Sequence, residues 1–326
     1  MRRAVLAVLN GLLLLLLIGC GSLPLSPTGN GNEYQVTDDQ GTVIKLRGKP
    51  QRIMTTHFHL DSILLGVVPQ ERVVSVTARF DDPNISYAAP HEFEKPQRDT
   101  AIFPSMEGIV AKQPDLLIVR STIGEEKIQS YRDMGIPVYV CEIPRDMEEL
   151  KTKIRGIAAV TGEKANGELL IAKMTQLLEE TIQEIPDDVA YTRSCVLVSK
   201  MNHAYGGKGC FFDEMCRLAK VRNAVADLGL WNGQEISKEI IVRANPDYLL
   251  TEGWGSYGSS EAAAREISED PAFEKLVAVK EGHVAGVRSK YLYNSNQNCV
   301  YAVRYLANIV YGTHFPEGEE KFLRGY

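Results

Sequence analysis

Short catalytic motifs are missing from this chain of 326 residues. It contains no H-E-x-x-H metal motif, no G-x-S-x-G nucleophile turn and no G-x-x-x-x-G-K-[ST] phosphate loop. The nearest approach to a phosphate loop, Gly206-Gly207-Lys208-Gly209, has glycine where Ser or Thr should bind magnesium, so it indicates a turn. Cys141, Cys210 and Cys216 stand in no recognisable catalytic context. We therefore expect a protein that is not an enzyme and that carries no resident cofactor.

An excess of positive charge is also lacking. The chain has 36 Lys and Arg against 42 Asp and Glu, a net charge of −6. A phosphate backbone needs a basic face, so this balance argues against nucleic acid as a partner. A hydrophobic content of 44% and a charged content of 24% are typical of a globular protein. The length predicts two domains, because a chain of this size exceeds the length at which a single hydrophobic core keeps growing.

No apolar run reaches the ~20 residues that a membrane-spanning helix needs. The longest run, residues 4–18, follows Arg2 and Arg3 and is typical of a secretory signal. It ends in Leu17-Ile18-Gly19-Cys20, which resembles a bacterial lipoprotein cleavage box, and this implies lipidation of Cys20. We expect residues 1–19 to be a signal peptide and residues 20–33 a flexible tether, so that the protein is extracytoplasmic and anchored to the cell membrane.

Cysteine is scarce and shows no metal-binding spacing. Cys20 aside, five remain, and the odd count leaves at least one free thiol if any pair forms. Cys210 and Cys216 could pair, but their spacing is not of the C-x-x-C kind. Structural burial is the simpler interpretation for most of these residues.

The feature around which the chain is organised is a long helix predicted at residues 164–185. Its apolar positions have helical spacing, and Pro186-Asp187-Asp188 ends it. At roughly 1.5 Å per residue the rod would be about 33 Å long. The expected buried face consists of Ala165, Leu169, Ala172, Leu177, Leu178, Thr181, Ile182 and Ile185.

Strands and helices alternate on both sides of this helix, which predicts parallel sheets with right-handed crossovers. We expect strands at 51–56, 72–77, 115–119, 138–140, 194–199, 248–251 and 282–287, a loop at 57–59, and helices at 60–66, 105–112, 125–134, 147–161, 211–219, 237–244, 271–276 and 298–311. Residues 105–118 and 237–250 share one plan: Ser-x-Glu, an apolar helix, Gln or Asn before Pro-Asp, then an apolar strand. This match indicates an internal repeat of two similar lobes.

The repeat, the long helix and their order resemble the helix-hinged class of substrate-binding proteins that serve ABC importers of ferric siderophores, cobalamin and haem. The resemblance covers roughly residues 34–311. It implies two Rossmann-like α/β lobes joined by one rigid helix, with the ligand in the cleft between them, and an ABC permease as partner of a monomeric protein. The domains expected are 34–162, the helix 163–186, and 187–326.

The resemblance also implies a docking role for Glu107 and Glu239, each two residues past the serine of its repeat unit. Two exposed charges on separate lobes would set orientation and association rate. The alternative is that each is a first-turn glutamate favoured by the helix dipole.

Ligands of parallel sheets gather beyond the carboxyl ends of the strands. The residues expected there are aromatic with scattered cations, which suits a large flat ligand held by stacking and a few charged hydrogen bonds. The candidate ligand-binding residues are His57, Phe58, His59, Arg79, Phe80, Tyr205, Trp254, Arg288, Tyr291 and Tyr293.

The roles of these candidates stay open at the level of sequence. His57 and His59 could meet a metal centre, or one could be satisfied within the protein and the other exposed. Tyr291 and Tyr293 could offer a phenolate to Fe(III) or only stack. Arg79 and Arg288, on opposite lobes, could clamp an anionic ferric complex or be solvated surface charges.

The transported ligand is expected to be an iron complex, with ferric siderophore ranked before cobalamin and haem because of the cations on the lobes. A zinc- or manganese-binding protein shares the hinged architecture. It would need several histidines and a carboxylate to converge, and no acidic His-rich loop accompanies the four candidates, His57, His59, His203 and His283.

Overall fold

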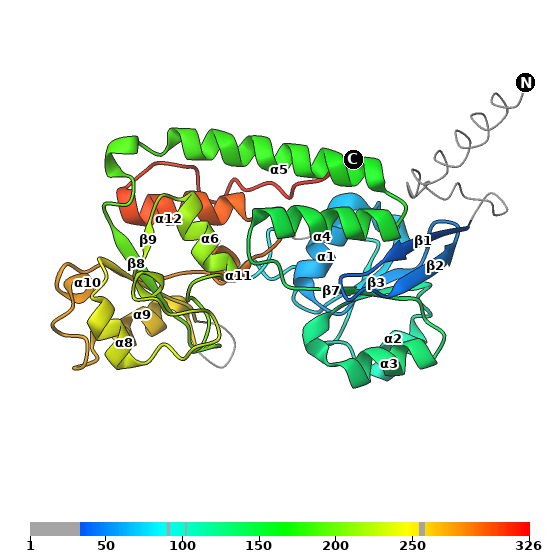
Figure 1. Ribbon diagram of the computed structural model, residues 1–326, viewed down its shortest axis with the longest axis horizontal. Helices are drawn as coiled ribbons and strands as arrows, with labels where there is room; N and C mark the ends of the chain where they lie inside the picture. Colours follow the sequence, from blue (N-terminus) through cyan, green and yellow to red (C-terminus); the bar gives the residue numbers. More distant parts are fainter. Residues whose placement is uncertain (1–32, 90–91, 102, 254–257) are drawn as a thin grey trace, which may run out of the picture.

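Two α/β lobes are joined by one long helix in the computed structural model of the chain (Figure 1). The structure describes residues 33–89, 92–101, 103–253 and 258–326. Helix α5, Lys164–Glu184, runs along both lobes, so the predicted rod is confirmed. None of the helices in the described ranges has the length and apolar content that a bilayer crossing requires. The proposed signal peptide, Cys20 and the tether up to residue 32 lie outside the described residues, whereas Glu33, which was assigned to the tether, begins strand β1.

The N-terminal lobe is built on a parallel sheet. Within the described residues its strand order is β5-β4-β3-β6-β7, with β3 Ile53–Thr55, β4 Val73–Val76, β5 Gln97–Arg98, β6 Leu116–Arg120 and β7 Val138–Cys141. Its helices are α1 Phe58–Val67, α2 Met106–Ala111, α3 Glu125–Asp133 and α4 Met147–Val160, with 3-10 turns at Gln70–Arg72 and Ser121–Ile123. Strand β5 was not predicted, and neither was an antiparallel hairpin formed by β1 Glu33–Thr37 and β2 Val43–Arg47.

The C-terminal lobe repeats this plan. In the described part of the chain its parallel sheet has the order β11-β10-β8-β9, with β8 Ser194–Val198, β9 Arg222–Asn223, β10 Tyr248–Thr251 and β11 Val284–Gly286. Its helices are α6 Phe211–Leu218, α7 Ala224–Asp227, α8 Lys238–Ala244, α9 Ser260–Ser268, α10 Val277–Lys280, α11 Lys290–Tyr293 and α12 Val300–Tyr311, with a 3-10 turn at Asp187–Val189.

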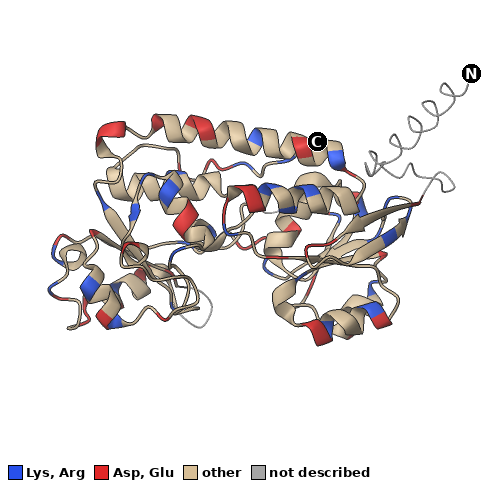
Figure 2. Ribbon diagram, viewed as in Figure 1, with Lys and Arg blue, Asp and Glu red and all other residues tan. Residues whose placement is uncertain are grey.

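The helix predicted at residues 271–276 is wrong, because this segment forms turns and α10 begins only at Val277. Helices α7, α9 and α11 and strand β9 were not predicted. Helices of four residues, such as α7 and α11, are too short to show a 3.6-residue period. Acidic and basic residues are interspersed over both lobes and along α5 (Figure 2).

The buried face of α5 differs from the predicted one. Ala165, Leu169 and Ala172 are exposed, whereas the buried positions of α5 are Gly167, Leu170, Ile171, Met174, Leu178 and Thr181. Glycine at position 167 allows α4 to approach closely, since a Cβ there would lie 2.5 Å from the Cβ of Ala158. The close crossing of α4 and α5 therefore determines which face of α5 is buried. The spacing of apolar side chains alone does not reveal this face.

The internal repeat is confirmed at the level of the backbone. The hydroxyls of Ser105 and Ser237 cap α2 and α8 by accepting from the backbone N–H three residues on. Gln113 and Asn245 occupy matching positions before the Pro-Asp pair, and both have left-handed backbones with φ of 47° and 39°. Two helices with the same cap and the same exit geometry enter two equivalent strands.

The aspartate of each unit ties that strand to its neighbour. Asp115 accepts hydrogen bonds from the backbone N–H groups of Gln51 (2.7 Å) and Arg52 (2.8 Å), before β3. Asp247 accepts from the backbone N–H of Ser194 (2.8 Å), at the start of β8. The equivalent aspartate of each lobe thus helps to set the register of the two central strands of its sheet.

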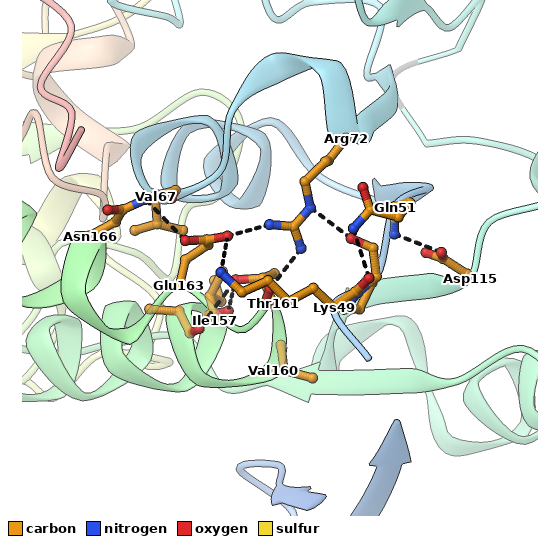
Figure 3. A network of polar contacts seen from close by, with 12 residues as sticks. Lys49, Gln51, Val67, Arg72, Asp115, Ile157, Val160, Thr161, Glu163 and Asn166 are labelled. Atoms are coloured by element: carbon orange, nitrogen blue, oxygen red, sulfur yellow. Dashed lines mark hydrogen bonds and ion pairs between the residues drawn. The ribbon is translucent and has the colours of Figure 1, made fainter. Parts of the chain in front are cut away.

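The N-terminal root of α5 is held to the N-terminal lobe by a polar network (Figure 3). The guanidinium of Arg72 pairs with Glu163, the N-cap residue of α5, and donates to the carbonyls of Pro50 and Thr161, both at 2.7 Å. Lys49 adds a second ion pair to Glu163 at 3.0 Å. Because the side chains of Arg72 and Glu163 are largely buried, this root is rigid relative to the lobe.

The C-terminal tail, residues 312–326, runs from α12 back to the N-terminal lobe beside α5 (Figure 1). The N–H of Gly325 donates to the carbonyl of Gly66 (2.8 Å), and the hydroxyl of Tyr326 donates to that of Leu65 (3.1 Å). The two lobes are therefore joined by the tail as well as by α5.

Candidate functional site

A cavity of about 500 Å³ lies between the two lobes. Its walls are mainly aromatic and apolar, with two basic side chains from the N-terminal lobe. The lining includes His57, Phe58, His59, Phe103, Arg120 and Arg145 from that lobe, and Met201, Tyr205, Phe211 and Tyr293 from the C-terminal lobe. A gap lined by both halves is therefore present, and it brings together five of the ten candidate residues.

The turn between β3 and α1 positions the histidine pair. The sequence predicted a loop at residues 57–59. The structure differs, because α1 begins at Phe58 and His57 is its N-cap. Buried Asp61 fixes this turn by accepting from the hydroxyl of Thr55 (2.8 Å) and from the backbone and hydroxyl of Thr77 (2.9 and 2.7 Å). Burial raises the pKa of Asp61 to about 6, although these hydrogen bonds favour its ionised form.

His57 is a buried, neutral imidazole. Its Nε2 lies 2.7 Å from a guanidinium nitrogen of Arg120, which can only donate, and its Nδ1 lies 3.3 Å from the backbone N–H of His59. A doubly protonated ring would place an N–H against each of these donors. Burial, then the charges of Arg120 and Lys153, hold the pKa of His57 well below its usual value.

Arg120 is the last residue of β6, at the carboxyl end of the sheet. Burial lowers its pKa, and its contact among the described residues is with His57 and not with a carboxylate. Arg145, at the rim, pairs with Glu149. Arg120 is thus a cation in the cleft wall whose contact within the described chain is with an uncharged ring.

His59 has an unsatisfied nitrogen. Its Nε2 is buried and has no hydrogen-bond partner within the described part of the chain. Burial, followed by His57, Arg120 and Lys153, holds the pKa of His59 well below its usual value. The ring packs edge-on against Phe58 with centroids 4.2 Å apart. An unpaired buried nitrogen costs free energy, which a ligand could recover.

Two tyrosines form the opposite wall. The rings of Tyr205 and Tyr293 are tilted with centroids 5.1 Å apart. The hydroxyl of Tyr293 donates to that of Ser199 (2.6 Å), which in turn donates to the buried carboxylate of Glu252 (3.2 Å). Burial raises the pKa of both tyrosines well above the usual value, so both stay neutral. This arrangement favours stacking over a phenolate ligand.

Other candidates lie in a second, more polar cavity of about 640 Å³, which includes Arg79, Arg288 and Tyr291. Arg79 pairs with Asp82 at 3.0 Å. Tyr291 stacks on Tyr305, with centroids 4.0 Å apart, and its hydroxyl contacts Glu320. The structure brings the two arginines and Tyr291 together, but not with the histidine pair.

Phe80 lies in the core of the N-terminal lobe, not on a cavity wall. Its side chain is fully buried and packs edge-on against Phe93 and Phe322, with centroids 5.7 and 6.2 Å apart. The expected ligand contact is therefore not supported, because neighbours in sequence can point to opposite sides of a turn. The tenth candidate, Trp254, lies outside the described residues.

The cleft residues that were not predicted as ligand contacts include Phe103, Arg120 and Arg145. Arg120 had a usable signal, because it directly follows a predicted strand at the carboxyl end of the sheet, where ligands gather. Phe103 is 61% exposed and lies in an irregular segment, so no periodic pattern could have marked it.

Glu107 and Glu239 are both exposed on the second residue of α2 and of α8. These helices lie on the same side of the molecule, opposite α5 (Figure 1). Across the described ranges, no group of three or more His, Cys, Asp or Glu side chains is placed to hold a metal ion.

Comparison with known proteins agrees with this architecture. The family model described as periplasmic binding protein matches residues 56–291. The uncharacterized ABC transporter substrate-binding lipoprotein YvrC of Bacillus subtilis is 23% identical over 93% of this chain and 95% of its own length. The iron-uptake system-binding protein of the same organism is 24% identical over 69% of each chain.

Among solved structures, the apo form of the periplasmic heme-binding protein RhuT from Roseiflexus sp. RS-1 superposes with a TM-score of 0.65. It is 21% identical and the match covers 79% of this chain and 97% of that one. The shared fold is the two-lobed, helix-hinged one. The chain therefore belongs to the periplasmic binding protein family, whose members are the non-enzymatic solute-binding components of ABC importers.

Proposed function

We propose that this protein captures haem outside the cytoplasm and delivers it to an ABC permease. One observation carries the proposal: one wall of an apolar cleft holds a buried histidine nitrogen that has no hydrogen-bond partner and a partly buried guanidinium that has no carboxylate partner among the described residues. A cavity of about 500 Å³ is within the range of small-molecule sites.

The aromatic walls suit a flat, conjugated ligand. Phe58 lies on one lobe, and Tyr205 and Tyr293 lie on the other, so a planar ring between them could stack on both sides. Since both tyrosines stay neutral and Tyr293 donates its hydroxyl proton into the protein, they offer ring faces and not charge.

The iron atom of haem would find a ligand in His59. Its lowered pKa keeps the imidazole uncharged at neutral pH, so that the ring retains a lone pair for a metal. Coordination would satisfy a buried nitrogen that has no partner in the described chain, so binding would relieve a cost already present in the free protein.

The carboxylates of haem would find a partner in Arg120. In this partly buried wall the guanidinium faces a neutral imidazole. A hydrogen bond to a carboxylate would be stronger than this contact, because both partners would be charged. We therefore favour haem as the transported ligand over the ferric siderophore that was expected from the sequence. That preference rested on Arg79 and Arg288, which line a different cavity from the histidine pair. Ferric siderophore and cobalamin remain the alternatives.

Anchoring and docking complete the proposal. Lipid on Cys20 would keep the protein near its permease, and the ligand-loaded form would dock through Glu107 and Glu239. Two exposed acids on one side of the molecule support this role, because they can orient the protein on basic residues of the membrane subunits.

Absorbance titration of the full-length protein in detergent with haem tests the ligand. We expect a saturable shift of the Soret band with one haem per chain. His59→Ala should alter that spectrum, whereas His203→Ala, at an exposed histidine, should leave it unchanged. No shift with haem, together with saturable binding of cobalamin or a ferric siderophore, would contradict the assignment. Stoichiometric zinc or manganese in protein purified without chelator would instead favour the metal-binding alternative.

A further inference from the structure

Two buried thiols meet in the core of the C-terminal lobe. Cys195 lies on β8 and Cys216 lies on α6, and their Sγ atoms are 3.6 Å apart. Both side chains are at most 1% exposed. The sulfurs of a disulfide are bonded at about 2.05 Å, so these two would have to approach each other by only about 1.5 Å.

The pairing of Cys210 with Cys216, which the sequence left open, does not fit helix α6. Cys210 is the N-cap of this helix and Cys216 is its sixth residue. Six residues at about 1.5 Å each separate their backbones by about 9 Å along the axis. This exceeds the ~7 Å that a disulfide spans between Cα atoms. Cys195 is 21 positions from Cys216, so no local spacing marked the pair.

The cellular compartment favours oxidation of such a pair. The chain belongs to the periplasmic binding protein family, whose members work outside the cytoplasm, where disulfides form and persist. In the folded protein, burial raises the pKa of Cys216 well above its usual value, so this thiol stays protonated and unreactive. In the unfolded chain the thiols are exposed and have ordinary pKa values. The bond must therefore form before the core closes.

We propose that Cys195 and Cys216 form a disulfide while the exported chain folds. The thiolate of one cysteine attacks the S–S bond of a disulfide oxidant outside the cytoplasm, forms a mixed disulfide and releases one thiolate of the oxidant. The thiolate of the other cysteine then attacks the mixed disulfide, forms the bond and releases the second thiolate. Two electrons and two protons pass from the cysteine pair to the oxidant, which ends as a dithiol.

This bond would fasten together the two segments that carry the C-terminal wall of the cleft. The backbone N–H of Phe212, on α6, donates to the hydroxyl of Tyr205 (3.2 Å). Ser199, just after β8, accepts from the hydroxyl of Tyr293 (2.6 Å). A disulfide between β8 and α6 closes the loop of residues 195–216 and so restrains both tyrosines of the wall.

Peptide mapping of the full-length protein tests the bond directly. The protein is isolated from its membrane, quenched with acid and alkylated without reduction. Tryptic peptides 194–200 and 209–217 should then be found linked, and reduction should separate them. Because peptide 209–217 contains both Cys210 and Cys216, two variants assign the bond: Cys210→Ser should keep the link and Cys216→Ser should lose it. Separate, alkylated peptides in the native protein, or a link that persists in Cys216→Ser, would overturn the proposal.

Thermal unfolding tests what the bond contributes. The full-length protein is unfolded and then refolded in detergent with and without a thiol reductant. Closure of a loop of this size should raise the unfolding midpoint of the oxidised form by about 5–10 °C over the reduced form. Cys195→Ala/Cys216→Ala should unfold at the same temperature under both conditions, whereas Cys299→Ala, which retains the pair, should keep the difference. Equal midpoints for the two forms of the native protein would contradict the fastening of β8 to α6.

Discussion

The guanidinium of Arg120 lies 2.7 Å from Nε2 of His57 in the wall of the cleft between the lobes. A cation whose contact is a neutral imidazole is available to an anion that enters the cavity.

Arg120→Gln should weaken haem binding. Loss of a charge-assisted hydrogen bond costs about 1.5–3 kcal/mol, which corresponds to a roughly ten- to hundredfold rise in Kd. Arg145→Gln is the control and should have a smaller effect, because Arg145 already pairs with Glu149. Absorbance titration measures both. Equal affinities of the native protein and the Arg120 variant would show that no anionic group binds there.

Stability should fall as the pH drops below about 6.5. His57 and His59 have folded pKa values well below the unfolded value, so the unfolded state binds more protons in this window. Each histidine contributes a slope of up to about 1.4 kcal/mol per pH unit. Asp61, with a pKa raised to about 6, acts in the opposite direction between pH 6 and 4 and offsets part of the loss.

Urea unfolding at pH 7.5, 6 and 5 checks this pH dependence. His57→Gln/His59→Gln should flatten the fall between pH 6.5 and 5, because the variant has no histidine to protonate in the turn. A fall of the same slope in the variant would assign the effect to other groups.

Arg72→Ala should destabilise the protein strongly. The side chains of Arg72 and Glu163 are only 11% and 15% exposed, and removal of one partner of such a pair costs about 3–5 kcal/mol. Arg155 and Glu168 form an ion pair whose side chains are 49% and 58% exposed, so Arg155→Ala should cost less than about 1 kcal/mol. Denaturant midpoints compare the two variants, and similar midpoints would contradict the role assigned to the root of α5.

Substitution of Phe58 should mainly weaken ligand binding, whereas substitution of Phe80 should mainly lower stability. Phe80→Ala creates a cavity in the core and should cost about 3–5 kcal/mol of unfolding free energy. Phe58→Ala removes a ring from the cleft wall and should weaken haem binding severalfold, with a smaller loss of stability. Parallel unfolding and titration experiments check both expectations. The reverse pattern would restore the placement expected from the sequence.

Gly325→Val should release the C-terminal tail. A Cβ at this position would lie 1.8 Å from the backbone oxygen of Asn166, so the tail cannot keep its place beside α5. Hydrogen exchange should then become faster in α1, whose carbonyls at Leu65 and Gly66 lose their partners. Tyr326→Phe removes one hydrogen bond and should cost only about 1 kcal/mol. Unchanged exchange in the valine variant would mean that the tail does not fasten the lobes.

The sequence by itself determined the two-lobed plan. The 3.6-residue period of residues 164–185, the apolar runs of the strands and the paired Ser-x-Glu and Pro-Asp units are local patterns. They depend on neighbours along the chain, and they predicted the long helix, the parallel sheets and the repeat correctly. The turn chemistry of Gln113 and Asn245 belongs to the same local class.

Only the tertiary structure decided which side chains meet. The buried face of α5 follows from Gly167 against α4, and Phe80 lies in the core against Phe322 of the distant tail. The separation of Arg79 and Arg288 from the histidine pair and the contact of Arg120 with His57 arise in the same way. In each case the packing of segments far apart in sequence sets the direction of a side chain, and no local period carries that information.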